Sequence, residues 1–450
     1  MYTREDSKKQ LLEKGILVKP SEAEEYCKDT KLKFQKLENG TTFFGIQKMV
    51  EDSENTNLEL QYNFGAYCDP AEKLGMTHLL EHLWFSEKFN KSMIENHVNK
   101  NGWTSSRALN MSIGGIWNEK YSLYSLPSVL DEVLHNFFHH DNIKSKQNLN
   151  IEIDVVNREI AEADTDFFKY SIREKFLPFI LPGHELNVNV LGKSNTLADI
   201  SLEDLKKFTK EKFTTTNSYV KLFVEGEDDK LSRVSDQLFE RLGKVETSDL
   251  LSPMIPEYIF DENNFPKGDF RLDTDGKFRE RVMGIILFPI RLTIPDRLNY
   301  ALSHFESRFN DDLFVKIRKN GLAYSASILN LRINSEYILF GAHFVSTKDK
   351  ITEILPKFTK EFFNVFEDYV NDPKLLEREV ELESLRQKAS PILKQSILED
   401  SANMYLEYGY LSNIYKYREL ISSISVHDLL EFSNIVTKAK TTNILVGDLD

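Results

Sequence analysis

Apolar and polar residues alternate along this chain with two periods, one typical of strands and one typical of helices. Period-two runs predict strands with one buried face, and the clearest are Leu58–Phe64, Val220–Val224, Val282–Phe288 and Tyr337–Phe344. Between these runs lie long segments in which apolar residues recur three and four apart, the spacing of an amphipathic helix. Strands and helices interleave without the glycine-rich βαβ turn of a nucleotide-binding fold. The pattern therefore predicts an α+β fold.

One stretch of the pattern occurs twice. Ile-Ser-Leu-Glu-Asp-Leu-Lys-Lys-Phe, from Ile200, recurs as Ile-Ser-Val-His-Asp-Leu-Leu-Glu-Phe, from Ile424, and each copy leads through Thr and Asn into an apolar strand. Ser201 with Asp204, and Ser425 with Asp428, resemble the capping boxes that begin helices. The offset of 224 residues is close to half of the 450-residue chain. We infer a duplication, so the chain should consist of two similar halves.

The predicted boundary lies between the two copies. Residues 248–268 hold three prolines among acidic and polar residues, which is typical of an extended linker. We predict an N-terminal domain over residues 1–247 and a C-terminal domain over residues 269–450. Residues 1–31 precede the first strand-like segment, Leu32–Gln47, and read as a charged helical extension of unknown purpose.

Candidate chemistry is concentrated in the run His78-Leu-Leu-Glu81-His82. Met76, Leu79, Leu80 and Leu83 form an apolar stripe at about 100° per residue, which places the two histidines and Glu81 on the other face of a helix. His78 and His82 are one turn apart, so both imidazoles can reach one metal ion. An ordinary surface helix would also be polar on this face.

A second helical pattern, Asn148–Asp164, offers acidic partners. Glu152 and Glu159 are seven residues apart, hence two turns along one face. Val155 and Val156 flank that face, so the Glu159 carboxylate should point toward the packed side of the helix. Because burying an unpaired carboxylate is costly, a divalent cation or a salt bridge to Arg or Lys would be needed there. This segment by itself favours neither.

Together these motifs resemble those of the pitrilysin/insulysin family of zinc metallopeptidases, in which His-x-x-Glu-His is followed some seventy residues later by Glu-x6-Glu. Glu159 lies 77 positions after His82. The resemblance implies that His78, His82 and Glu159 bind one zinc ion, that Glu81 is the general base and that Glu152 helps to hold the site. It also implies two-layer domains with a largely antiparallel sheet. Positions 224 beyond the two histidines are Leu302 and Glu306, so the second half lacks the zinc motif.

The same resemblance implies substrate-binding residues. Arg318 and Tyr324 match the family's Arg/Tyr segment in type, although they are six residues apart where the family more often shows seven. The alternative reading of this segment is a helix end capped by Gly321 and followed by a strand. Ser105 and Ser106 stand where the family tends to place Asn-Ala on the strand beside bound substrate.

Composition limits where this protein can be located and which partners it can bind. Two cysteines in 450 residues cannot form a disulfide framework, and the first residues contain early acids and no signal-like apolar core, so we expect a cytoplasmic protein. No run approaches the roughly 20 apolar residues of a membrane span. The formal net charge of −14 disfavours nucleic acid as a partner.

The sequence thus predicts a zinc-dependent endopeptidase that hydrolyses peptides or small unfolded polypeptides. Short members of the family often pair so that four domains enclose the substrate, so the resemblance implies a homodimer, or a heterodimer with a related chain. The alternative is a non-catalytic partner or scaffold subunit, because family domains can lose their chemistry and serve assembly.

Overall fold

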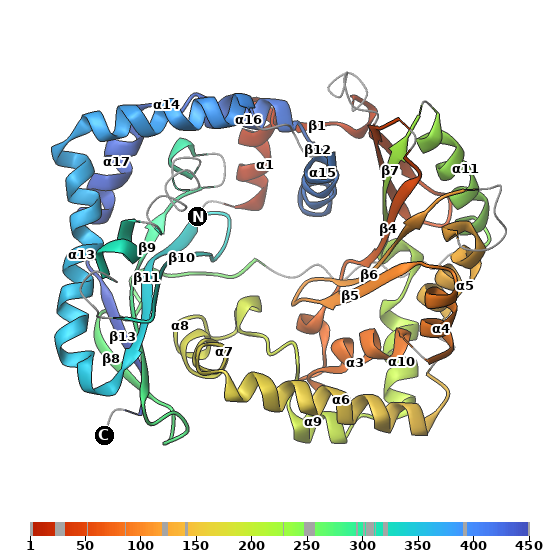
Figure 1. Cartoon of the computed structure of the whole chain (residues 1–450), viewed down its shortest axis with the longest axis horizontal. Coiled ribbons are helices and arrows are strands. Elements are labelled where there is room, and N and C mark those ends of the chain that lie inside the picture. The colour runs from red at the N-terminus through yellow and green to blue at the C-terminus, as the bar shows by residue number, and fades with distance from the viewer. Residues whose placement is uncertain are drawn as a thin grey trace.

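We describe the protein from a computed structural model. The described residues are 3–22, 32–51, 53–85, 87–118, 125–139, 143–227, 229–246, 257–293, 296–299, 302, 310, 312–317, 323–389 and 394–448. Two sheets lie on opposite sides of the molecule, and each carries helices on its outer face (Figure 1). This arrangement confirms the predicted α+β class.

The first sheet has the strand order β2-β3-β7-β4-β6-β5. Only the β3–β7 pair is parallel, and the other neighbours are antiparallel. The strands are β2 (Leu32–Lys36), β3 (Thr42–Met49), β4 (Asn55–Tyr62), β5 (Asn99–Thr104), β6 (Leu109–Ile116) and β7 (Ser218–Gly226). Strand β5 ends the sheet, so its outer edge pairs with no other strand of the described chain.

Helices cover one face of this sheet and form the first core. The core joins Leu58, Leu60 and Val220 of the sheet to apolar residues of seven helices. These are α3 (Met76–Trp84), α4 (Glu87–Glu95), α5 (Leu126–His139), α6 (Lys146–Thr165), α9 (Ser194–Ala198), α10 (Leu202–Lys212) and α11 (Lys230–Leu242). Alternate strand residues point into this core because side chains alternate across a pleated strand.

The second sheet repeats the first with the order β8-β13-β9-β11-β10, and only β8–β13 is parallel. Its strands are β8 (Gly268–Asp273), β9 (Arg281–Arg291), β10 (Ser325–Arg332), β11 (Tyr337–Thr347) and β13 (Thr442–Gly447). Five strands of the first sheet, β3, β7, β4, β6 and β5, have counterparts in the same spatial order about 224 residues later. The two copies of the repeated motif are α10 and α17 (Val426–Thr437), and both begin with the predicted capping boxes.

Both faces of the second sheet are covered at its central strands, β9 and β11. One face packs on α13 (Ile351–Asn371), α14 (Pro373–Ala389), α16 (Ile414–Ser422) and α17. The other face packs on a segment from the first half of the chain, α7 (Phe167–Tyr170), the π-helical turn η4 (Ser171–Phe176) and α8 (Leu177–Ile180). Strand β9 therefore holds a continuous apolar run, because neither of its faces meets water.

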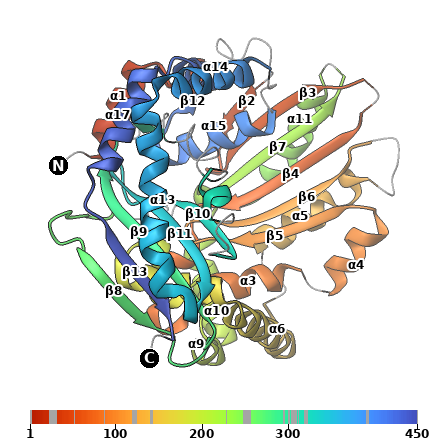
Figure 2. The same cartoon turned by 60° about the vertical axis from the view of Figure 1, so that its left-hand side comes forward.

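Packing crosses the predicted boundary in two further places. Helix α1 (Arg4–Glu13) lies with the second half (Figures 1 and 2). Its Leu11 is buried in the second core. Strand β1 (Leu17–Val18) then pairs with β12 (Leu411–Ser412) before the chain enters the first sheet. Of the extension predicted over residues 1–31, the part from α1 to β1 thus packs with the second half.

Helix α15 (Lys394–Tyr408) makes the reverse contact. It belongs to the second half but packs on the inner face of the first sheet, where Ile397, Leu398 and Ala402 meet Phe44 and Ile46. The structure describes residues 257–268 of the predicted linker, and there Phe265 is buried against the second sheet and Gly268 already begins β8. No helix in the described part of the chain is long and apolar enough to cross a membrane.

Candidate metal centre and active site

Helix α3 carries the His-x-x-Glu-His run. Its apolar side, with Leu79, Leu80 and Leu83, is buried in the first core. The opposite side faces α6, and His78 is itself only 8% exposed because α6 covers it. The helix predicted from periodicity is confirmed, and its polar face is closed over by a second helix.

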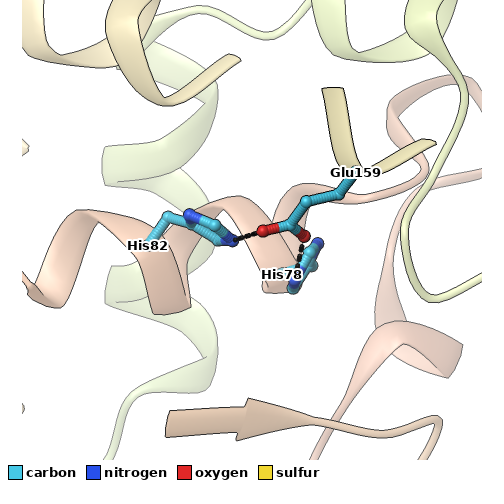
Figure 3. Close-up of side chains that lie close together, drawn as sticks. All are labelled: His78, His82 and Glu159. Carbon is cyan, nitrogen blue, oxygen red and sulfur yellow. Dashed lines mark ion pairs between the residues drawn. The ribbon is translucent and has the colours of Figure 1, made fainter. Parts of the chain in front are cut away.

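Two glutamates of α6 meet the two histidines of α3. In Figure 3 the Glu159 carboxylate lies between the imidazoles, with Oε2 3.6 Å from His78 Nε2 and Oε1 3.5 Å from His82 Nε2. Glu152, two turns earlier, places Oε2 3.3 Å from His82 Nδ1. Of the two partners expected for the Glu159 carboxylate, a cation or a basic side chain, no Lys or Arg of the described residues forms an ion pair with it.

This arrangement fits a divalent metal ion. Ligand atoms of His78, His82 and Glu159 all lie within 4.8 Å of one another. Atoms bound to one tetrahedral zinc ion at about 2.0–2.2 Å lie roughly 3.3–3.6 Å apart, close to the two nitrogen–oxygen separations above. Burial and the neighbouring His82 lower the pKa of His78 to about 4, so at pH 7 its imidazole is neutral and has a free lone pair. Two imidazoles and one carboxylate are a common zinc ligand set.

Glu152 acts on His82 and not on the shared centre. Its carboxylate faces Nδ1, which favours the tautomer that carries the proton on Nδ1 and leaves the Nε2 lone pair directed at Glu159. Such an outer partner fixes the orientation of a metal-binding histidine and raises its basicity. This geometry is compatible with the supporting role that the resemblance implies for Glu152.

Glu81 is held from the other side by strand β5. Thr104 Oγ1 donates a 2.6 Å hydrogen bond to Glu81 Oε2. Gly102 faces the same carboxylate so closely that a Cβ there would stand 3.0 Å from Glu81 Oε1 and 2.6 Å from the Phe85 ring. Burial raises the pKa of Glu81 above its ordinary value, while the Thr104 hydrogen bond opposes that rise. A carboxylate with a raised pKa is better suited to accept and return a proton near neutral pH.

Ser105 and Ser106 lie just past this position, after β5 has ended. Their backbone carbonyls accept hydrogen bonds from the amides of Ala66 and Tyr67, and Ser105 Oγ accepts from the Ala108 amide at 2.9 Å. These hydrogen bonds therefore stabilise the turn that follows β5. Their substrate-binding role stays a prediction, and the β5 residues that contact Glu81 are Thr104 and Gly102. Sequence reasoning missed both, although Thr104 immediately precedes the pair that it selected.

The Arg/Tyr segment is described only in part, because Arg318 lies outside the described residues. Tyr324 is 73% exposed at the start of β10, and its amide donates to the Val345 carbonyl. It lines a hollow of about 780 Å³ together with Phe168, Arg281 and Glu162. Glu162 follows Glu159 by about one helical turn, so this hollow begins close to the metal-binding cluster.

The second half carries leucine at two positions that correspond to residues of the site. Leu302, which corresponds to His78, and Leu376, which corresponds to Glu152, are 1% and 0% exposed in the second core. The counterpart of His82, Glu306, lies outside the described residues. Leucines at the two described positions complete a core and cannot bind a metal ion, so the described part of the second half has no equivalent centre.

Comparisons with known proteins agree with this architecture. A family model described as the peptidase M16 inactive domain matches residues 199–383. That segment begins after Glu159 and includes none of the five residues of the proposed centre. A protein named an uncharacterized zinc protease, from Rickettsia felis, is 24% identical over 437 residues, which cover 92% of this chain and 97% of the relative.

Two solved structures show the same fold. A protease from Helicobacter pylori superposes with a TM-score of 0.69 at 17% identity, over 93% of this chain and 99% of that one. Pitrilysin superposes with a TM-score of 0.62 at 14% identity, over 93% of this chain but only 45% of its own. The domain model, the sequence relative and the fold together support the M16 family, in agreement with the resemblance to pitrilysin-type peptidases.

Proposed function

We propose that this protein is a zinc-dependent endopeptidase that hydrolyses peptides or small unfolded polypeptides. The observation that carries the proposal is the convergence of four polar side chains from α3 and α6, His78, His82, Glu159 and Glu152, beside a fifth, Glu81, that is held by an edge strand. None of these side chains is needed to complete the apolar core, and three of them form a ligand set that suits zinc.

His78, His82 and Glu159 would hold the ion, and Glu152 would keep His82 oriented. A bound zinc ion supplies Lewis-acid chemistry, lowering the pKa of water and polarising a carbonyl group. Glu81 would take a proton from the attacking water and later deliver it to the leaving amine. Its raised pKa and its partial burial suit both transfers.

The free edge of β5 offers a place for the substrate backbone. An extended peptide can add to such an edge through main-chain hydrogen bonds. Because Gly102 and Thr104 of β5 contact Glu81, a peptide paired with this strand would lie beside the proposed general base. This mode of binding selects extended or unfolded chains over folded proteins. Tyr324, and Arg318 by resemblance, would donate hydrogen bonds to the peptide or to the oxyanion.

A dimer is part of the proposal. The chain spans less than half the length of pitrilysin, so two copies would supply the same number of domains. A pair of chains could then close a chamber around the substrate, and a cytoplasmic location remains our expectation.

The test compares the Glu81→Gln variant with the unaltered protein and with Glu95→Gln, an exposed glutamate of α4, as matched control. Each would be incubated with a defined peptide mixture, and the products would be identified by mass spectrometry. We expect near-stoichiometric zinc in all three proteins, and chelator-sensitive cleavage in all but Glu81→Gln. Cleavage by Glu81→Gln at the unaltered rate would refute the role of Glu81.

A non-catalytic subunit is the second candidate, because the matching family model is described as an inactive domain. Zinc binding without cleavage of any peptide in the mixture would favour this candidate over the enzyme.

A further inference from the structure

Helix α3 begins without a cap of its own. Its first flanking residue is Gly75, which has no side chain to accept a hydrogen bond from the exposed amides of the first turn. Those amides need acceptors, because the first four N–H groups of a helix have no partner within it. The required acceptor comes instead from a residue six positions earlier, Asp69.

Both carboxylate oxygens of Asp69 are directed at this helix start. Oδ2 accepts from the Gly75 amide at 2.9 Å, and Oδ1 accepts from the Thr77 amide at 3.0 Å and from Thr77 Oγ1 at 2.5 Å. Asp69 is 9% exposed and Thr77 is fully buried. Burial raises the pKa of Asp69 to about 7, and the hydrogen bonds from Thr77 and Gly75 oppose that rise.

The loop containing Leu191 and Gly192 also restricts the backbone of this turn. Gly75 has φ of 91°, and a Cβ at this residue would stand 2.7 Å from the Leu191 carbonyl oxygen and 2.9 Å from Gly192 Cα. Asp69 and the loop containing Gly192 therefore contact the first turn of α3 from two sides. The residue that follows Thr77 in this turn is His78, a proposed zinc ligand.

We propose that Asp69 is a positioning residue for the metal centre and sets the direction of His78 through the first turn of α3. The inference rests on the proposed zinc-binding function. Helix α3 is short, so a frayed first turn would leave only His82 and Glu159 in register. Binding of zinc would then have to reorder His78, and the affinity would fall.

A matched control exists in the second half. Asp428 is similarly buried, 8% exposed, and caps α17 by accepting the Ser425 amide and hydroxyl, each at 2.7 Å. It is remote in sequence and belongs to the other core. Replacing it by Asn removes a comparable helix cap but should leave α3 unchanged.

The experiment measures zinc affinity of the metal-free full chain by competition with a chromogenic chelator, together with hydrogen exchange of the α3 amides. For Asp69→Asn we expect zinc affinity to fall roughly 10-fold, the lower end of the loss seen when a group that contacts a metal ligand directly is removed, because Asp69 acts on His78 only through the backbone. Amide exchange in residues 76–80 should become faster. For Asp428→Asn we expect a lower thermal midpoint, unchanged α3 exchange and unchanged zinc affinity.

A second pair of variants covers the case in which Asp69→Asn does not fold. Thr77→Val removes only the hydroxyl donor and should weaken zinc binding, whereas Thr77→Ser should retain it. Unchanged zinc affinity in Asp69→Asn, or an equal loss in Asp428→Asn, would overturn the inference. If the unaltered protein binds no zinc, the proposed function fails, and α3 exchange in Asp69→Asn against Asp428→Asn still decides whether Asp69 orders this turn.

Discussion

The Thr104 hydroxyl of the edge strand donates a hydrogen bond to Glu81 of helix α3, with 2.6 Å between the two oxygens. Under the proposed function, the strand whose free edge would bind a peptide is therefore the one that holds the proposed general base. The position of the substrate and the position of the base would then be coupled through a single side chain.

Removing this hydroxyl should change the pH dependence of cleavage. The Thr104 hydrogen bond stabilises the ionised form of Glu81 and opposes the rise of its pKa caused by burial. In Thr104→Val that opposition is lost, so the pKa of Glu81 rises further. A general base acts in its deprotonated form, and the acid limb of kcat/KM against pH should therefore move to higher pH. Thr104→Ser keeps the hydroxyl and should keep the profile, and coincident acid limbs for the Val and Ser variants would contradict this assignment.

Loss of Glu152 should weaken metal binding without removing a metal ligand. Its carboxylate lies 3.3 Å from His82 Nδ1 and orients that ring. We expect zinc affinity to fall by about 10- to 100-fold in Glu152→Ala. Competition with a chelator measures the change, and Asp154→Ala, an exposed position two residues further along the same helix, is the control. An affinity equal to that of the unaltered protein would show that Glu152 does not orient His82.

A buried ion cluster joins the two halves of the chain. Removing its cation should account for most of the stability lost in the substitution Lys221→Met. Lys221 of β7 is 3% exposed and pairs with Glu59 of β4 and, at 2.8 Å, with Glu399 of α15. Lys221→Met leaves two carboxylates without their cation, and we expect a loss of about 3 kcal/mol in the free energy of unfolding. Glu399→Gln leaves Lys221 paired with Glu59 and should cost less, about 1 kcal/mol. Urea denaturation would measure both, and a larger loss in Glu399→Gln would contradict this account.

The same cluster gives Lys221→Met a distinctive response to pH. Burial raises the pKa of Glu59 above its ordinary value even though Lys221 opposes the rise. An acid whose pKa is higher in the folded state binds more protons there than in the unfolded state, so its contribution to stability increases as the pH falls. Without Lys221 the pKa of Glu59 rises further. The loss in free energy of unfolding caused by Lys221→Met, measured by urea denaturation, should therefore become smaller as the pH is lowered from 7 to about 5. A loss that becomes larger as the pH is lowered would argue against a buried carboxylate as its cause.

Helix α1 should stabilise the second half, although it opens the chain. Leu11 is 1% exposed and lies in the second core, so Leu11→Ala should lower the free energy of unfolding by about 2–5 kcal/mol. Lys9→Ala, at an exposed position of the same helix, is the control. All three tryptophans, Trp84, Trp103 and Trp117, lie in the first half. As Leu11→Ala is denatured, circular dichroism reports on both halves, whereas tryptophan fluorescence reports on the first half. The circular dichroism signal should therefore change at a denaturant concentration no higher than the fluorescence does. A fluorescence change at a lower concentration would place α1 with the first half.

Local patterns were sufficient to predict several elements. The stripe through Leu79 and Leu83 predicts α3 because helical periodicity is a property of neighbouring residues. The paired Ser and Asp at the starts of α10 and α17 predict capping boxes for the same reason, since those hydrogen bonds span three residues. The duplicated motif predicted two similar halves, and the matching strand orders of the two sheets agree with it.

Other features depend on contacts between distant residues. Thr104 reaches Glu81, Asp69 caps α3, and α1 enters the core of the opposite half, but no local periodicity records these pairings. The position of Glu159 could be anticipated only by resemblance to a family, because spacing alone left a salt bridge equally open.

The sequence by itself determined which residues could form a metal site and that such a set occurs once, since apolar periodicity and residue type are encoded locally. Only the tertiary structure decided that α6 closes over α3 with Glu159 between His78 and His82, and that an edge strand holds Glu81. The physical reason is that packing of the first core brings together helices and strands that are far apart in the chain, and those distances set the chemistry of the site.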